Sequence, residues 1–463
     1  MVAQGGHTTA VHVPDESEVV VEHLELDDQP TGHQFHNLKP QEAVDAGIGT
    51  VAQEVVNELR VEDLEVGCGH GEASKNAAGN SPSGGRGAAP SGRCVRYAPS
   101  GGQDMTVMRT AIQLTAEGGA WPDLVTYVTE AERLGVDHCW VAEAWGGDAA
   151  TPIAALAQHT DRMTFGSGVF QVGARSAANT AMTALTLQRI TDGRFSLGLG
   201  ASGPQVIEGL HGVPFGRPLT RMRETIEVVR MAEAGEKLIL DGAQVRLPLP
   251  GGEGKALRLS LLPGDIPLAV YIASLSPRML ALTGEVADGW LGTSFVPEGA
   301  RSSMDALAEG AARSGRTLAD LDLCQGAEVA FARDDDDLAE MVAARKPGLA
   351  FSLGGMGSAD TNFYNAAYAR QGFAKEAAES QALWLAGRRD AAAASIPDAM
   401  VLATTLIGNE SQVADRLALW RDVGISHIRL YPAGDTLDER LATLGRALDL
   451  VRGLGSSQPI DGP

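Results

Sequence analysis

Three segments of small residues are the first candidates for a binding site in this sequence: FGSGV at 165–169, GLGASG at 198–203 and IASLSPR at 272–278. Glycine and serine leave room for a flat ligand to lie directly against the backbone. A glycine can also serve only to let a strand bend, so each segment alone is a weak signal. Together, the segments indicate a site for a flat organic ligand.

The usual motifs for other kinds of catalysis are missing. The chain has no His-x-His or HExxH pair, no GxSxG elbow, no P-loop and no GxGxxG after its first predicted strand. Its four cysteines are scattered without metal-ligand spacing, which is typical of reduced, partly buried thiols. The sequence therefore predicts no metal site and does not favour a hydrolase, an NTPase or an ordinary dinucleotide-binding enzyme.

The charge of the chain also excludes classes of partner. Lys+Arg total 37 and Asp+Glu total 59, which gives a formal charge of −22. Nucleic acid is repelled by so acidic a surface, because its binding depends on neutralising phosphates. No run approaches the roughly 20 apolar residues of a membrane span, and the start lacks a secretory signal. We expect a cytoplasmic protein that acts on a small molecule.

Residues 1–107 differ in composition from the rest. An acidic start is followed by a run rich in glycine, serine and proline at 79–104. Such a composition cannot bury enough apolar surface to offset the entropy lost on ordering. We expect a disordered extension, or a start codon assigned too far upstream, with translation beginning at Met105 or Met108. A flexible tail is expected over 456–463.

Between residues 108 and 455, short apolar runs alternate with longer helical patterns. Eight candidate strands begin near residues 110, 138, 163, 195, 266, 289, 324 and 427. Repeated strand–helix units predict an α/β protein with a (β/α)8 TIM-barrel fold, and a doubly wound open sheet is the alternative. The connections 203–265 and 333–426 are too long for simple crossovers. We expect them to be insertions, helical in large part, at the C-terminal face of the barrel, where they would form lids or substrate walls.

The segment 165–230 resembles the luciferase-like monooxygenase superfamily, and most of all its branch that uses the deazaflavin coenzyme F-420, to which methylenetetrahydromethanopterin reductase belongs. The segments WVAEAWGGDAATPIAALA, YIASLSPRMLALTGEVADGW and SLGGMGSADTNFYNAAYARQGF resemble the same family in the same order. The resemblance covers 108–452 and none of 1–107.

The resemblance implies an oxidoreductase that transfers a hydride between reduced coenzyme F-420 and a small organic substrate, working as a homo-oligomer, which we expect to be a dimer. Two alternatives stay open. One is an FMN-dependent monooxygenase of the luciferase type, and the other is a non-catalytic flavin-binding protein.

The resemblance also implies where the coenzyme lies. The ring would lie over a cis peptide bond on the third strand, here between Gly168 and Val169, and the phosphate would lie at the loop after the fifth strand. Ser276 and Pro277 would expose backbone N–H groups at a helix start, although capping alone would explain this pair. The arginines at 175, 217 and 221 are further candidates for the acidic tail. The cofactor-binding residues implied are Ser167, Gly168, Val169, Ser202, Gly203, Ser274, Leu275, Ser276 and Arg278.

The chain departs from the family at two acidic positions. Gln113, and either Pro204 or Gln205, stand where several relatives have acids, so the proton must be handled elsewhere. We expect Glu143 and His211 to be the catalytic residues, although either could be only a structural hydrogen-bonding group. Glu208 and Tyr271 are weaker candidates.

Overall fold

The computed structural model describes residues 108–261, 266–358 and 361–456. The expected extension over 1–107 lies outside the described residues. The same holds for nearly all of the expected tail over 456–463, because the last helix ends at Ser456.

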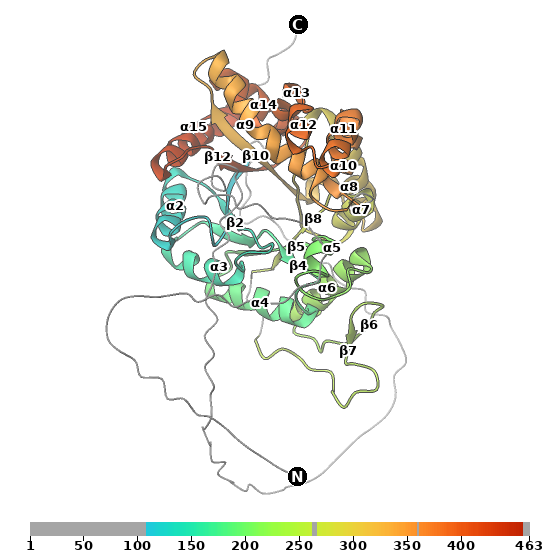
Figure 1. Ribbon diagram of the computed structural model, residues 1–463. Helices are drawn as coiled ribbons and strands as arrows, with labels where there is room; N and C mark the ends of the chain where they lie inside the picture. Colours follow the sequence, from blue (N-terminus) through green and yellow to red (C-terminus); the bar gives the residue numbers. More distant parts are fainter. Residues whose placement is uncertain (1–107, 262–265, 359–360, 457–463) are drawn as a thin grey trace, which may run out of the picture. The chain divides into compact units, whose positions relative to one another are not determined.

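Eight parallel strands form a closed barrel (Figure 1). Their spatial order is β9, β10, β12, β1, β2, β3, β5 and β8, and β8 pairs again with β9. Closure rules out the doubly wound sheet and confirms the predicted barrel. The strands are β1 (Arg109–Leu114), β2 (His138–Val141), β3 (Thr164–Ser167), β5 (Phe195–Gly200), β8 (Ala269–Ala273), β9 (Gly289–Leu291), β10 (Asp322–Phe331) and β12 (His427–Pro432).

Two short strands were not expected. The strand β4 (Phe170–Gln171) pairs with β5, and β11 (Leu406–Gly408) pairs with the last residues of β10. The strand β4 comes directly after β3, and β11 pairs only with the end of β10, so neither changes the barrel.

Helices surround the barrel (Figure 1). The first shows why they form, since Leu124, Val128 and Ala131 share one buried face and Gly135, with a φ of 99°, ends the helix. The surrounding helices are α2 (Trp121–Leu134), α3 (Ala150–Leu156), α4 (Ala177–Ile190), α6 (Pro218–Glu233), α7 (Pro277–Val286), α8 (Arg301–Arg313), α14 (Glu410–Asp422) and α15 (Leu437–Ser456).

Two large rings fill the middle of the barrel. Trp140 and Tyr271 are buried, and their ring centroids lie 5.0 Å apart in an edge-to-face arrangement. A Cβ atom added to Gly166 would lie 2.4 Å from the Trp140 ring, and one added to Gly289 would lie 2.2 Å from the Tyr271 ring. A Cβ on Gly198 would lie 1.9 Å from a backbone oxygen of β3. These glycines therefore serve the core, rather than the ligand contact suggested by FGSGV and GLGASG.

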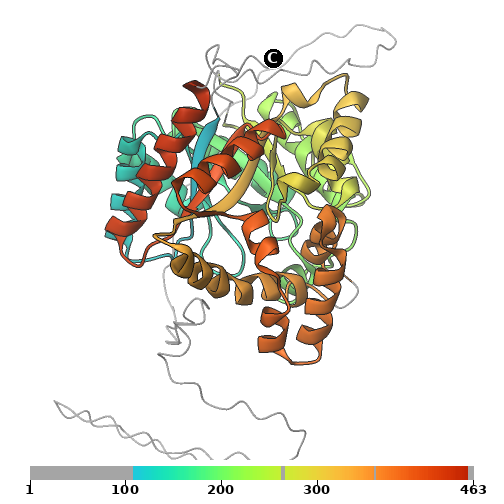
Figure 2. The same cartoon turned by 90° about the horizontal axis from the view of Figure 1, so that it is seen from above.

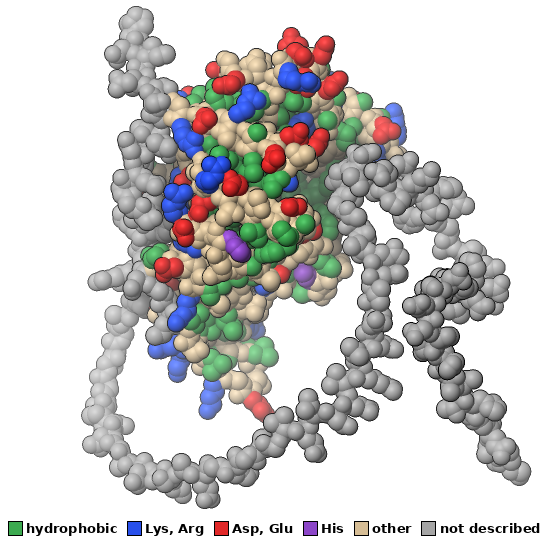
Figure 3. Space-filling model, turned by 90° about the vertical axis from the view of Figure 1, so that its left-hand side faces the viewer, with side chains coloured by type: hydrophobic (Ala, Val, Ile, Leu, Met, Phe, Trp, Pro, Cys, Tyr) green, Lys and Arg blue, Asp and Glu red, His purple; other side chains and the backbone are tan. Residues whose placement is uncertain are grey.

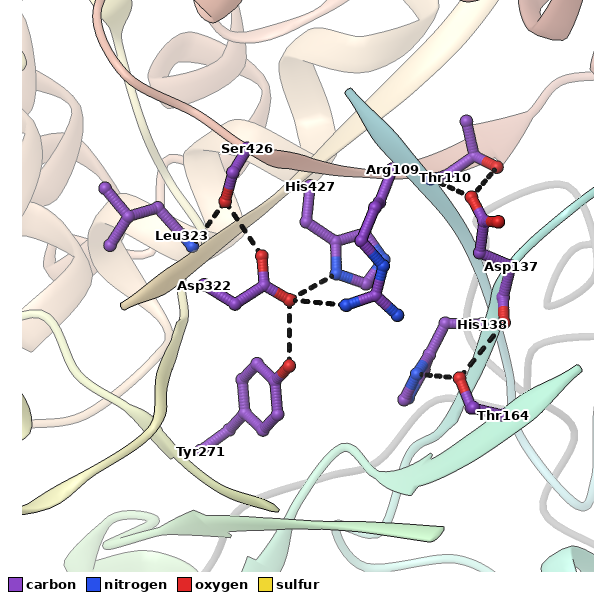
Figure 4. Close-up of polar contacts among 10 residues, drawn as sticks. All are labelled: Arg109, Thr110, Asp137, His138, Thr164, Tyr271, Asp322, Leu323, Ser426 and His427. Carbon is purple, nitrogen blue, oxygen red and sulfur yellow. Dashed lines mark hydrogen bonds and ion pairs between the residues drawn. The ribbon is translucent and has the colours of Figure 1, made fainter. Parts of the chain in front are cut away.

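A carboxylate at the start of β10 gathers the polar groups below these rings (Figure 4). Asp322 Oδ2 accepts hydrogen bonds from Arg109 at 3.0 Å, from the Tyr271 hydroxyl at 2.8 Å and from His427 Nδ1 at 3.0 Å. Its other oxygen accepts one from Ser426. Because Asp322, Arg109 and His427 each begin a strand, the cluster closes the N-terminal end of the barrel.

The charges in this cluster stabilise one another. Burial alone would raise the pKa of Asp322, but His427 and Arg109 hold it well below its usual range. Burial alone would lower the pKa of His427, but Cys324 and Asp322 raise it to about 9. The cluster therefore contains an internal ion pair at the N-terminal end of the barrel. Groups at this end stabilise the fold, whereas catalysis takes place at the C-terminal end.

The first insertion divides into two parts. Residues 203–217, with the short helix α5 (Pro204–Ile207), follow the C-terminal end of β5. A short hairpin of β6 (Leu240–Asp241) and β7 (Arg246–Leu247) follows α6. Three backbone N–H groups in the turn of this hairpin donate hydrogen bonds to the carboxylate of Glu224, which belongs to α6. The hairpin thus lies beside α6 rather than over the strand ends (Figure 1), so it does not form the expected substrate wall.

The second insertion covers part of the mouth, as expected (Figure 2). The Gln371 side chain accepts from Val296 N at 2.7 Å and donates to Ser294 O at 2.8 Å, in the segment that follows β9. The Arg370 guanidinium donates to Leu275 O at 2.7 Å, beyond the end of β8. The helices of this insertion are α9 (Asp335–Gly354), α10 (Phe363–Tyr368), α11 (Ala374–Leu385), α12 (Arg389–Ala394) and α13 (Asp398–Thr404), with a π-helical turn at Ala369–Phe373.

Three further features concern the helices, the surface and the cysteines. No helix in the described part of the chain is long and apolar enough to cross a membrane. On the face drawn in Figure 3, acidic and basic side chains are interspersed. Cys139 and Cys324 are buried free thiols, as expected, whereas Cys68 and Cys94 lie outside the described residues.

Replacing Asp322 should test the support at the base of the barrel. We expect Asp322→Asn to lower the free energy of unfolding by about 3 kcal/mol in urea titrations at pH 6, because it leaves a buried cation without its partner. The folded pKa of His427, about 9, exceeds its ordinary 6.5. The stabilisation from His427 is thus complete below about pH 6.5 and is lost as the pH rises through about 9. The difference between Asp322→Asn and the wild type should therefore shrink toward pH 10.

Asp449→Asn is the matched control. Asp449 is 77% exposed and pairs with Arg452 on the surface of α15, so its replacement should cost less than about 1 kcal/mol. A loss in Asp322→Asn that stays constant from pH 6 to pH 10 would show that His427 is not charged in the folded protein.

Candidate active site

A cis peptide bond joins Gly168 and Val169, directly after β3. The Gly168 N–H donates to Val141 O of β2 at 2.7 Å, and the Val169 side chain packs on the buried cluster around Trp140. Gly200 at the end of β5 faces Val169, since an added Cβ would lie 2.4 Å from a Val169 methyl carbon. The cis bond expected from the resemblance is confirmed, and it lies at the C-terminal mouth.

The serines and glycine expected beside this bond have different surroundings. The Ser167 hydroxyl is fully buried and exchanges hydrogen bonds with the N–H and C=O of Gly198, at 3.0 and 2.9 Å. Ser167 therefore ties β3 to β5. Ser202 has a left-handed backbone with φ of 58°, and Gly203 precedes α5; both are half-buried. Ser202 and Gly203 thus lie at the edge of the mouth, directly after the end of β5.

The loop after β8 is held by side-chain hydrogen bonds. Ser274 is buried, and its hydroxyl lies 2.9 Å from that of Thr283. The Ser276 hydroxyl accepts from Met279 N at 3.4 Å, so it caps α7 as its spacing from Pro277 predicts. Arg278 is exposed on the first turn of this helix. The capping explains Ser276 without a ligand, and it leaves the helix start accessible.

Arg370 is a residue of this region that sequence reasoning missed. It reaches Leu275 from the second insertion, and burial lowers the pKa of its guanidinium. In the described part of the chain it has no acidic partner. A small hollow of about 10 Å³, roughly the space of one water molecule, lies between Arg370 and Ser274. The resemblance already included the segment AYARQGF, but it gave no role to the arginine in this segment. That was the one available sign that Arg370 lies near the site.

Two predicted site residues are paired with each other. Glu143 Oε2 accepts from the Arg175 guanidinium at 2.9 Å and from Ala149 N at 3.0 Å, and the ion pair is largely buried. The Arg175 guanidinium also lies 4.4 Å from the centroid of the Phe170 ring. Glu143 thus holds the start of α3 as well as a cation, and it would have to release Arg175 before it could exchange a proton freely.

The other predicted charged residues lie on the insertion after β5. His211 is exposed, and no hydrogen bond of its side chain is present among the described residues. Arg217 is exposed just before α6. Arg221 donates to Pro214 O and to Gln244 Oε1. Four arginines were predicted to bind the acidic tail of the coenzyme. Of these, Arg217 and Arg278 are exposed, and their side chains form no hydrogen bond or ion pair among the described residues.

A second group of polar residues lies on the opposite rim, where β1 and β12 end. The Tyr431 hydroxyl lies 3.4 Å from Gln113 Oε1, and Arg429 is almost fully buried next to Tyr431. Burial raises the pKa of Tyr431, which a hydrogen bond from Arg429 partly offsets. Gln325 is fully buried, and neither atom of its amide group has a partner in the described structure. His427, Arg429 and Tyr431 alternate along the sequence and therefore lie on one face of β12, a signal that was missed, whereas Gln113 was expected near the site.

A hollow of about 290 Å³ opens beside this group. This volume is at the small end of the size of ligand pockets. Its lining comes from β1, β12 and the helices α2 and α15: Gln113, Leu114, Thr115, Gly118, Gly119, Asp123, Leu124, Tyr127, Tyr431, Pro432 and Arg440.

The mouth of this closed barrel has small residues at its strand ends, and Arg217, Arg278 and Arg370 there have no acidic partner among the described residues. This arrangement is typical of a barrel enzyme that binds an anionic small molecule. Residues 105–427 match the family model of the luciferase-like monooxygenases. The chain belongs to this family, as the resemblance predicts, and is an oxidoreductase.

Comparisons with individual proteins agree. The chain is 38% identical over 327 residues, 69% of this chain and 93% of the relative, to a Mycobacterium tuberculosis protein provisionally named a coenzyme F-420-dependent oxidoreductase. It is 32% identical over 230 residues to 5,10-methylenetetrahydromethanopterin reductase of Methanolobus tindarius, over 50% of this chain and 67% of the relative. The solved coenzyme F-420-dependent tetrahydromethanopterin reductase of Methanopyrus kandleri shares the fold, with a TM-score of 0.61, 21% identity, and coverage of 73% of this chain and 97% of the other.

Proposed function

We propose that this enzyme transfers a hydride between reduced coenzyme F-420 and a small organic substrate. The observation that carries the proposal is the place of Val169 at the mouth, packed on the Trp140 cluster and against Gly200, where the resemblance puts the coenzyme ring. The Mycobacterium relative supports the choice of coenzyme, since the match extends over nearly its whole length. The homo-oligomer and the roles of the individual site residues remain part of the proposal.

The residues around the cis bond fit a flat ring. Val169 is supported from below by the buried cluster and from the side by Gly200, so its height in the mouth is fixed. Gly168 has little spare room, because an added Cβ would lie 3.2 Å from Trp140 Cβ. A ring resting on Val169 would thus have one face against the protein and the other open to a substrate, which is the arrangement that transfer requires.

The loop after β8 fits the phosphate of the coenzyme tail. Ser274, Leu275 and Ser276 lead into the N-terminus of α7, where backbone N–H groups and the helix dipole favour an anion. Arg370 and Arg278 are both exposed, and neither has an acidic partner among the described residues. In so acidic a chain, two such arginines beside one helix start favour an anionic ligand.

The chemistry divides between coenzyme and protein. When bound, the deazaflavin supplies the hydride on its central ring. The protein orients the ring on Val169, restricts water at the β8 and β9 side with the second insertion, and provides for the proton. We retain Glu143 and His211 as the residues that handle the proton. Glu143 is restrained by Arg175, whereas His211 has no described side-chain partner.

Titration of the purified protein with each coenzyme tests the function directly. We expect the fluorescence of oxidised coenzyme F-420 to change with a saturable, stoichiometric dependence on protein, and FMN to bind more weakly. Reduced coenzyme F-420 should then be oxidised in the absence of oxygen by members of a panel of carbonyl and enone compounds.

Other outcomes of this experiment identify the alternatives. Turnover that requires both reduced FMN and oxygen would contradict the proposal in favour of a monooxygenase, the reaction in the family's name. Stoichiometric binding of coenzyme F-420 with no turnover over the whole panel would favour a binding protein.

Substitutions at the cis bond should separate binding from transfer. We expect Gly168→Val to abolish measurable coenzyme binding, because its branched side chain would press on Trp140. Val169→Ala should bind the coenzyme with little change but slow substrate reduction by about tenfold or more, because the ring loses its support. Gly348→Val, at an open position on α9, is the control and should affect neither property. Equal losses of binding and rate in Val169→Ala would refute its separate role.

Substitutions of the two arginines should differ in strength. We expect Arg278→Gln to weaken coenzyme binding by no more than about tenfold, since contacts of an exposed charge are worth on the order of 1 kcal/mol. Arg370→Gln should weaken binding more, because the hydrogen bond to Leu275 O holds its guanidinium at this loop, whereas the Arg278 side chain has no described partner to position it. Arg301→Gln on the exposed surface of α8 should have no effect. Affinity unchanged in Arg370→Gln at low salt would remove it from the coenzyme site.

A further inference from the structure

The hollow between β1, β12, α2 and α15 lies across the barrel from the loop after β8. Going around the closed sheet, β1 and β8 are separated by three strands in one direction, β2, β3 and β5. They are also separated by three in the other, β9, β10 and β12. The hollow is therefore on the opposite rim from the proposed phosphate site, with Val169 of the β3 side between the two along the mouth. No role in binding the coenzyme tail accounts for its residues.

The outer part of the hollow contains a cation without an acidic partner. Arg440, near the start of α15, lies with its guanidinium 5.6 Å from the centroid of the Tyr127 ring. Its Nε atom is buried and has no hydrogen-bond partner, and its side chain forms no ion pair in the part of the chain that the structure describes. Because Arg440 lines the hollow and has no acidic partner among the described residues, its guanidinium is available to an anion there.

The inner end of the hollow is polar but uncharged on its surface. Gln113 and Tyr431 line it, and the Tyr431 hydroxyl, which receives a hydrogen bond from Arg429, is directed toward Gln113 Oε1 at 3.4 Å. Leu114, Leu124 and Pro432 supply apolar lining. The hollow thus combines a cation on α15, apolar side chains, and neutral hydrogen-bonding groups on β1 and β12.

We infer that the hollow binds a small carboxylic acid, with its carboxylate on Arg440 and its other end toward Gln113 and Tyr431. Two N–H groups of a guanidinium match the two oxygens of a carboxylate. Asp123 also lines the hollow, but it is exposed at the rim and forms no ion pair with Arg440. That this acid is the hydride acceptor rests on the proposed function, whereas its binding at Arg440 does not.

Binding of trans-cinnamate and of its neutral amide, trans-cinnamamide, tests the inference. The two probes have nearly the same shape and differ in charge. We expect isothermal titration calorimetry of the full chain to show that cinnamate binds at least about tenfold more tightly than the amide, because only the acid forms a charged pair. Saturation with coenzyme F-420 should leave this preference in place, since the two ligands occupy opposite rims.

Variants of α15 locate the binding. Arg440→Gln should abolish the preference for cinnamate, and Arg440→Lys, which keeps the charge but not the paired N–H groups, should retain part of it. Arg446→Gln is the matched control on the same helix, because Arg446 is about half exposed and already lies near Glu410 and over Phe331. It should behave as the wild type does.

Equal affinity of the wild type for the two probes would overturn the inference, whatever the variants do. A preference for cinnamate that persists in Arg440→Gln would overturn the assignment to this hollow, and tighter binding of a cationic probe such as cinnamylamine would assign the rim to Asp123 instead. Failure of coenzyme F-420 to bind would reject the proposed function alone, because the cinnamate measurement is made without coenzyme as well.

Discussion

The volume inside a closed barrel is fixed by its strands, and the filling of that volume by Trp140 determines the position of everything above it. The indole ring leaves no space for a Cβ atom at Gly166, and Tyr271 packs against it from the other side. Val169, turned by the cis bond, rests on this layer against Gly200. The floor of the mouth is therefore a consequence of core packing, and its height cannot change without disturbing the rings below.

The distribution of charge follows the same separation between base and mouth. At the base, Asp322 collects Arg109 and His427, so the buried charges are neutralised within the fold. At the mouth, the exposed Arg370 and the partly buried Arg440 lie on opposite rims, and neither forms an ion pair in the described structure. The chain has 59 acidic residues against 37 basic ones, so acids are abundant. The lack of an ion pair at these two arginines is therefore more informative than it would be in a basic protein, and it favours anionic ligands at both rims.

The sequence could predict what depends on local pattern. Strands and helices follow from periodicity, and the cis bond at Gly168 and Val169 follows from a resemblance in one continuous segment. It could not predict contacts made by closure of the barrel. Tyr431 meets Gln113 across 318 positions of sequence, because β12 pairs with β1 only when the sheet closes. Arg370 reaches the loop after β8 from an insertion whose own fold no periodicity fixes. A single sequence gives no sign of such contacts, because the residues around one partner in the sequence do not indicate where the other partner lies.

The two rims of the mouth are built from different parts of the chain, which bears on how ligand preference is determined. The second insertion contacts the backbone after β8 and β9 through Gln371 and Arg370, so the shape of that rim depends on an added segment. The other rim consists of barrel elements, the loop 115–120 and the starts of α2 and α15, and no insertion is needed to form it. If the coenzyme tail lies at the first rim and an acid at the second, changes in the loop 115–120 or near Arg440 alter the substrate without altering the coenzyme. The chemistry at Val169, between them, is then common to both.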